Sequence, residues 1–172
     1  VLFNTPVGFA VALFLGLSAI AHFIVASGAG FPKYMKVLEK NQNIFRWVEY
    51  SISSSVMIIL IAQVSGISDF VALLAIFGVN VSMILFGWVQ EKYTQPKDGD
   101  FLPFIFGCIT GIFPWIALVI LVIGPKAPME VQIPGFVYGI IVSLFLFFNS
   151  FALVQYLQYR AKGKWKNYLD RK

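Results

Sequence analysis

The chain has 172 residues, of which 59% are hydrophobic and 12% are charged, and its formal net charge at pH 7 is +5. Soluble domains are about half apolar and a quarter charged, so this composition excludes an ordinary soluble fold and indicates an integral membrane protein. The single cysteine, Cys108, excludes a disulfide framework and a thiolate metal site, and the single histidine, His22, adds little to the case for metal binding.

Five apolar stretches are each long enough to cross a bilayer core, which takes about 20 residues of helix. Backbone within lipid must be hydrogen-bonded internally, so these stretches predict helices; the alternation typical of barrel strands is absent. The sequence therefore predicts an all-α membrane protein, with a bundle of five transmembrane helices forming a single transmembrane domain over 1–172. The predicted spans are roughly 5–27, 44–64, 70–89, 102–123 and 133–156.

The basic residues are concentrated on one side of this five-helix zigzag. Twelve of the thirteen lie in 28–46, 90–101 and the tail 160–172, and Lys126 alone lies on the other side. The positive-inside rule places the three segments in the cytoplasm, so we expect a multi-pass plasma-membrane protein whose chain starts outside and ends inside. We interpret the net charge as a topology signal with some attraction to anionic lipid, and expect no nucleic-acid partner.

Glu49 is the acidic residue predicted to lie well inside a span, whereas the other seven fall in loops or at helix ends. An intramembrane carboxylate is costly and therefore marks a functional site by default. The alternative is an ion pair with Arg46, one turn earlier, near the cytoplasmic interface. The serines that follow either bond the carboxylate and line a polar cavity, or return their hydroxyls to carbonyls one turn earlier. They are Ser51, Ser53, Ser54 and Ser55.

Polar residues also recur in the first and third spans. Ser18 and His22 are four residues apart in the first span. A lone histidine there is expected to make one interhelical hydrogen bond, or to accept a proton if it shares a cavity with Glu49. In the third span Asn80, Met83, Gly87 and Glu91 share one face, for which packing against small residues is the favoured reading.

The last two spans carry a proline and an aromatic stripe. Pro114, beside Trp115, is predicted to kink the fourth span and free a carbonyl. Phosphate loops, zinc-ligand spacings and nucleophile–base pairs are absent from the sequence, so we expect neither an enzyme nor a metal site. One buried anion, several hydroxyls and an aromatic lining suit a cationic, elongated apolar ligand.

The segment RWVEYSISSS, residues 46–55, resembles the heliorhodopsins. These are retinal-binding proteins with seven membrane helices and an orientation inverted relative to other microbial rhodopsins. The resemblance covers nearly the whole chain and includes its charged and polar positions. It implies that the chain corresponds to helices two to six of that fold. Further similar segments are LSAIAHFIVASG, LLAIFGVNVSMILFGWVQEKYTQPKDGD and PGFVYGIIVSLFLFFNSFALVQYLQY.

The resemblance implies that all-trans retinal is the cofactor and that Glu49 is the counterion of its protonated Schiff base. Ser18 matches a serine near that Schiff base, and His22 matches the histidine of the adjoining polar cavity. The family attaches retinal to a lysine in the seventh helix, and no lysine falls inside the five spans here, so we expect that helix to be absent from this chain. The residues expected to line or surround the polyene are Tyr50, Ser54, Asn80, Met83, Pro114, Trp115, Phe148 and Asn149.

Three functions follow as alternatives. The first is a light-sensing photoreceptor that signals rather than pumps ions, forms homodimers and acts on a downstream partner. The second is a proton or cation channel or transporter that uses Glu49, and it predicts ion flux in the dark. The third is a non-photoactive membrane scaffold in which Glu49 only pairs with Arg46.

Overall fold

The computed structural model describes residues 7–40, 42–95, 97–124 and 135–160. Within these ranges every regular element is a helix, and all but α2 are long and apolar enough to cross a membrane. The predicted helical membrane bundle is therefore confirmed. The helices are α1 (Val7–Ala26), α2 (Phe31–Leu38), α3 (Ile44–Val64), α4 (Phe70–Tyr93), α5 (Leu102–Ile123) and α6 (Gly135–Arg160).

The helix boundaries follow from capping and from the polarity of the helix ends. Asn43 caps α3 by accepting from the backbone N–H of Arg46 at 3.1 Å, and Asp69 caps α4 by accepting from Ala72 at 2.8 Å. The predicted spans 44–64 and 102–123 coincide with α3 and α5. The predicted ends of the third and fifth spans are about one turn short, because polar side chains end the apolar run before the helical hydrogen bonding ends. The predicted starts at 5 and 133 lie outside the described residues.

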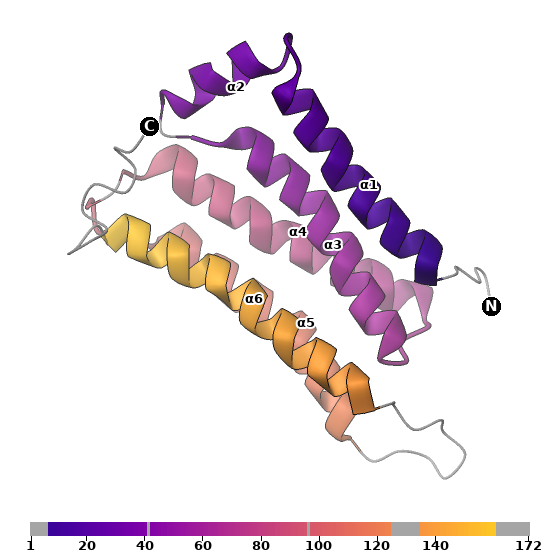
Figure 1. Ribbon diagram of the computed structural model, residues 1–172. Helices are drawn as coiled ribbons and strands as arrows, with labels where there is room; N and C mark the ends of the chain where they lie inside the picture. The colour runs from indigo at the N-terminus through magenta and orange to yellow at the C-terminus, as the bar shows by residue number, and fades with distance from the viewer. Residues whose placement is uncertain (1–6, 41, 96, 125–134, 161–172) are drawn as a thin grey trace.

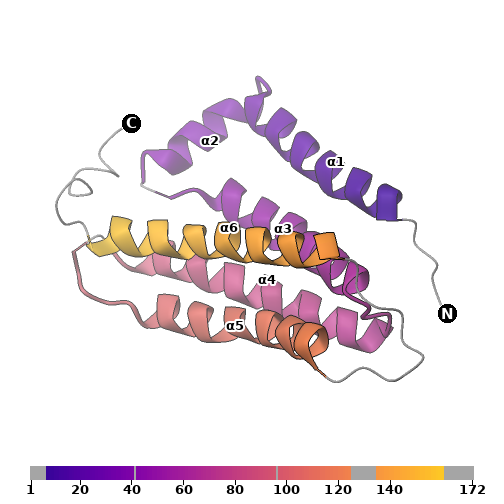
Figure 2. The ribbon, with the colours of Figure 1, turned by 60° about the horizontal axis from the view of Figure 1, so that its bottom comes forward.

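α4 is the central helix of the bundle. It packs between α3 and α5, while α1 lies on the outer side of α3 and α6 lies beside α5 (Figures 1 and 2). α5 runs unbroken through the buried Pro114, which has no N–H to donate to the preceding turn. The buried apolar core joins α3, α4 and α5 and consists of Ile58, Ile61, Ala62, Leu73, Trp115 and Leu118.

Glycines allow α4 to approach both neighbouring helices closely. A Cβ at Gly87 would lie 2.5 Å from the indole ring of Trp47 on α3, and a Cβ at Gly111 of α5 would overlap the Met83 sulfur. The predicted packing of the α4 face against small residues is observed at Met83, which meets Gly111 of α5, whereas on the α3 side the small residue is Gly87 itself and its partner is Trp47. Such contacts bring helices together in lipid, where the hydrophobic effect does not.

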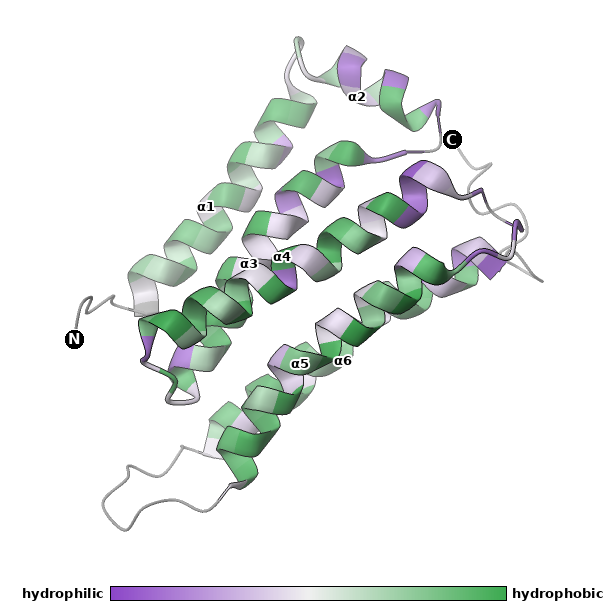
Figure 3. Ribbon diagram, turned by 180° about the vertical axis from the view of Figure 1, so that it is seen from behind, coloured by the Kyte–Doolittle hydropathy of each residue, from purple (hydrophilic) through white to green (hydrophobic). Residues whose placement is uncertain are grey.

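The outer surface is apolar and the basic residues are gathered at one end. α1 and α6 bury few residues, and their exposed faces are mostly hydrophobic (Figure 3). α2 lies across the end of the bundle where α1 finishes and α3 begins (Figure 1). All basic residues within the described ranges belong to this end: Lys33, Lys36, Lys40, Arg46, Lys92, Lys97 and Arg160.

Candidate functional site

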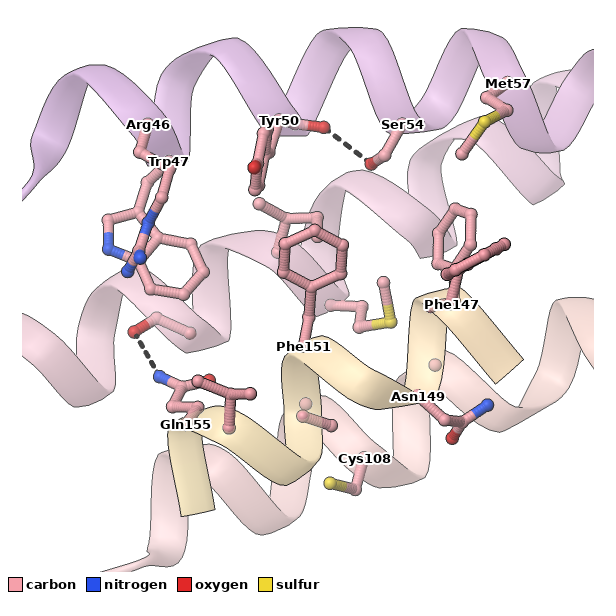
Figure 4. Close-up of a pocket in the computed structure, with 18 of the residues that line it drawn as sticks. Arg46, Trp47, Tyr50, Ser54, Met57, Cys108, Phe147, Asn149, Phe151 and Gln155 are labelled. Carbon is pink, nitrogen blue, oxygen red and sulfur yellow. Dashed lines mark hydrogen bonds between the residues drawn. The ribbon is translucent and has the colours of Figure 1, made fainter. Parts of the chain in front are cut away.

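A cavity of 490 Å³ lies among α1, α3, α4, α5 and α6. Its walls are mostly aliphatic and aromatic, and Figure 4 shows side chains from α3 and α6 directed into it. Tyr50 of α3 and Phe151 of α6 face one another across it, with ring centroids 5.3 Å apart in an edge-to-face arrangement. The volume falls within the range of about 300–1,000 Å³ typical of small-molecule sites.

Glu49 supplies a carboxylate to the wall of this cavity. The hydroxyl of Ser18 on α1 donates to Glu49 Oε1 at 2.7 Å, so the hydrogen bond joins α1 to α3 across 31 positions of sequence. The carboxylate has no ion-pair partner among the described residues. Arg46 also lines the cavity, but its guanidinium is paired with Glu91, so the Glu49 carboxylate favours a ligand whose polar end is positive.

Arg46, which the scaffold interpretation paired with Glu49, instead pairs with Glu91 at the end of α4. Its Nη2 lies 3.1 Å from Glu91 Oε2. Glu91 is buried and also accepts hydrogen bonds from the indole N–H of Trp47, at 2.6 Å, and from the backbone N–H of Asn43. The pairing of Arg46 with Glu49 is therefore not what the structure shows, because three donors from the start of α3 converge on Glu91.

Glu91 is the main polar residue whose role the sequence interpretation missed. The sequence predicts a helix end for Glu91, which is correct, but the side chain is almost fully enclosed there. Its position four residues after Gly87 was a usable signal, since the gap left by Gly87 admits the Trp47 ring that covers the carboxylate.

The serines of α3 mostly bond their own helix. Ser51, Ser54 and Ser55 donate to the carbonyls of Val48, Tyr50 and Ser51 at 2.6–2.8 Å. For these three serines the structure shows the predicted hydrogen bonds to carbonyls of the preceding turn. Ser53 and Ser54 line the cavity.

Asn80 of α4 uses the same serine oxygens from the opposite side. Its amide Nδ2 donates to Ser54 Oγ at 2.9 Å and to Ser55 Oγ at 3.0 Å. These two bonds tie α3 to α4 behind the cavity wall.

The aromatic residues on α5 and α6 form the second wall of the cavity. Trp115 is buried and makes edge-to-face contacts with Phe145 and Phe148, with centroid distances of 5.1 and 5.5 Å. Met83 lies opposite, against Gly111. Phe151, which also lines the cavity, was not singled out from the sequence, although its spacing of three residues from Phe148 was a usable helical signal.

The structure brings most of the predicted site residues to the cavity. Three do not line it. His22 is exposed on α1, and its Nδ1 lies 2.7 Å from the carbonyl oxygen of Ser18, which requires the proton on Nδ1. The other two, Asn80 and Pro114, are buried behind the wall. Asn149 borders the cavity, but its side chain is directed away from α3 (Figure 4). Those that line the cavity are Ser18, Glu49, Tyr50, Ser54, Met83, Trp115, Phe148 and Asn149.

Comparison with known proteins agrees with this arrangement. The model of the heliorhodopsin family matches residues 1–170, which is nearly the whole chain. No curated protein matches the chain. Five apolar helices, an aromatic cavity and this match together show that the chain belongs to the heliorhodopsin family and is a retinal-binding, multi-pass membrane protein of the rhodopsin type.

Proposed function

We propose that the protein is a light sensor that signals rather than pumps ions, with Glu49 as counterion to the Schiff base of all-trans retinal. The observation that carries the proposal is the state of Glu49: it borders an aromatic cavity, and its described polar partner is the neutral hydroxyl of Ser18. Arg46, the nearest cation in sequence, is engaged by Glu91. The Glu49 charge thus remains available to a cationic ligand.

The lining of the cavity suits retinal, an elongated apolar molecule. Its walls are apolar, with Trp115 and Phe148 at edge-to-face distance and Glu49 on the α3 wall. When bound, retinal supplies visible absorption and light-driven isomerisation. The residues of the chain would hold the retinal between aromatic side chains, and Glu49 would present its carboxylate to it. No lysine is among the described residues that line the cavity, so the covalent attachment point is not in this wall.

The polar groups around Glu49 support proton retention rather than conduction. The described carboxylates Glu49 and Glu91 lie on different helices, and Glu91 is saturated by three donors, one of them the Arg46 guanidinium. A pump needs carboxylates that exchange protons in sequence, and Glu91 is instead paired with Arg46 and enclosed at the end of α4.

The orientation and assembly belong to the same proposal. The basic end of the bundle faces the cytoplasm by the positive-inside rule, so the start of α1 faces outward across the plasma membrane. We propose that residues 1–172 act as one domain and that two copies associate through their lipid-facing helices, with a signalling partner at the basic end.

The test is visible spectroscopy on protein produced from its whole reading frame in the presence of all-trans retinal. Replacing Glu49 with glutamine should shift the absorption band and lower the pKa of the Schiff base, because the neighbouring negative charge is lost. Glu91→Gln is the matched control, since it neutralises another buried carboxylate away from the retinal. A pigment whose spectrum and titration are unchanged in Glu49→Gln would contradict the counterion assignment.

The same preparation distinguishes the channel alternative. Protein in liposomes should show no proton or cation flux in the dark, with or without retinal. Dark flux that is abolished by Glu49→Gln would replace the photoreceptor proposal with the channel.

A further inference from the structure

α2 is an eight-residue helix, FPKYMKVL, that separates its basic from its apolar side chains. Lys33 and Lys36 are three residues apart on one face, and Lys40 follows in the turn directly after the helix. Phe31, Met35 and Leu38 follow the same helical spacing on the opposite face. The helix therefore has one cationic and one apolar side.

α2 is attached to the bundle along a narrow strip. Tyr34 contacts Phe45 of α3 edge to face, with ring centroids 5.9 Å apart, and no residue of α2 is buried. Phe31 is 52% exposed and Met35 is 40% exposed, so a large part of each of these two apolar side chains is left without protein cover. Tyr34 fixes the helix while leaving this side open.

The three lysines are exposed and carry uncompensated charge. Within the described part of the chain Arg46 forms an ion pair with Glu91, whereas these three lysines form no ion pair. The adjacent Glu39 caps the end of α2 and is the nearest acid in sequence. The helix and its cap therefore carry a net positive charge.

The position of α2 matches a membrane surface. It turns across the end of the bundle at a steep angle to α1, where the apolar spans give way to charged loops (Figures 1 and 2). Figure 3 shows hydrophilic and hydrophobic residues alternating along it, in contrast to the mostly hydrophobic α1. Helices of this kind lie in the headgroup region with the apolar face toward the acyl chains.

We propose that α2 is an interfacial helix that binds anionic lipid headgroups. Lys33, Lys36 and Lys40 contact the phosphates, while Phe31 and Met35 enter the boundary between headgroups and acyl chains. Anionic lipid is the occupant that complements both sides at once, since a soluble anion would neutralise the lysines and leave the apolar pair in water. The α1–α3 connection thereby becomes sensitive to the lipid composition of its leaflet.

The test measures the depth of a nitroxide at Met35→Cys in a Cys108→Ser background. The protein is placed in nanodiscs of phosphatidylcholine, with or without phosphatidylglycerol, and collisions of the label with oxygen and with a water-soluble nickel complex are compared. The label should lie in the lipid, and deeper when phosphatidylglycerol is present. Exchanging Lys33, Lys36 and Lys40 for glutamine should abolish this dependence and weaken phosphatidylglycerol binding, counted by native mass spectrometry, more than about tenfold.

Two control variants make the outcome decisive. Exchanging the same lysines for arginine should preserve the lipid dependence, because charge is kept. Exchanging Lys92, Lys97 and Arg160 for glutamine removes three charges from the same end and should also leave it intact. The proposal would be overturned if the label remained in water in both lipids. It would also be overturned if the second control lost the dependence on phosphatidylglycerol to the same extent as the lysine-to-glutamine variant. Inorganic phosphate reproducing the effect of phosphatidylglycerol would overturn it as well, since that result would indicate a site for a free anion.

Discussion

The connection of Glu91 to the start of α3 gives the sharpest test of the fold. Glu91→Leu removes the acceptor for Trp47 Nε1 and for the backbone N–H of Asn43, in a place where the carboxylate side chain is 8% exposed. A buried donor left unpaired costs about 1–3 kcal/mol, so the two together predict a loss of roughly 4 kcal/mol in the free energy of unfolding. The bond to Arg46 adds little, because that side chain is 38% exposed and its charge is screened.

Glu91→Gln should cost less than Glu91→Leu. The glutamine carbonyl still accepts from one donor, and the charge it removes was itself costly to bury, so a loss of about 1–2 kcal/mol is expected. Unfolding by sodium dodecyl sulfate in mixed micelles, followed by circular dichroism, measures both. Glu39→Gln is the control, since Glu39 is exposed at the end of α2. If Glu91→Leu lies within about 0.5 kcal/mol of the parent protein, the convergence of donors on Glu91 is not what holds this end together.

Three further substitutions test individual contacts by the same unfolding measurement. Gly87→Ala should cost about 1–3 kcal/mol, because its methyl group meets the Trp47 ring, and Trp47→Leu should restore part of the loss if the clash is the cause. Asn80→Leu should cost about 1 kcal/mol from two interhelical hydrogen bonds, and no loss would show that these bonds are replaced in the variant. Gln90→Leu should cost about 2–4 kcal/mol, because the fully buried Gln90 amide accepts from the Phe104 N–H and donates to Thr94 Oγ1 and to the Asp100 carbonyl. An unchanged stability would mean that water takes over these hydrogen bonds in the variant.

The number and type of the membrane helices were predictable because they depend on local properties. A run of apolar residues long enough for the bilayer must be helical, so α3 and α5 were delimited correctly from hydropathy alone. The ends of α4 and α6 were predicted too early because hydropathy falls where the polar residues begin, whereas helical hydrogen bonds continue through them.

The pairing of the charged residues was not predictable in the same way. Arg46 was given a partner three positions away as one alternative, but its actual partner, Glu91, is 45 positions away and reaches it only when α3 packs on α4. Spacing along one helix identifies the residues that share a face, and it does not identify the face of another helix that covers them. The serines were better constrained, since their backbone acceptors lie in the same helix.

The attachments of α6 differ along its length. Among the described residues its hydrogen bonds to other elements lie near its last turns, where Gln155 Nε2 donates to the Gly87 carbonyl at 3.2 Å and the Tyr159 carbonyl accepts from Lys97 N–H at 3.1 Å. Further back it meets its neighbours through ring edges on Trp115 and Tyr50. Directional bonds resist displacement, whereas aromatic edges slide. One end of α6 is therefore fixed in register by directional hydrogen bonds, whereas the remainder is held by aromatic packing.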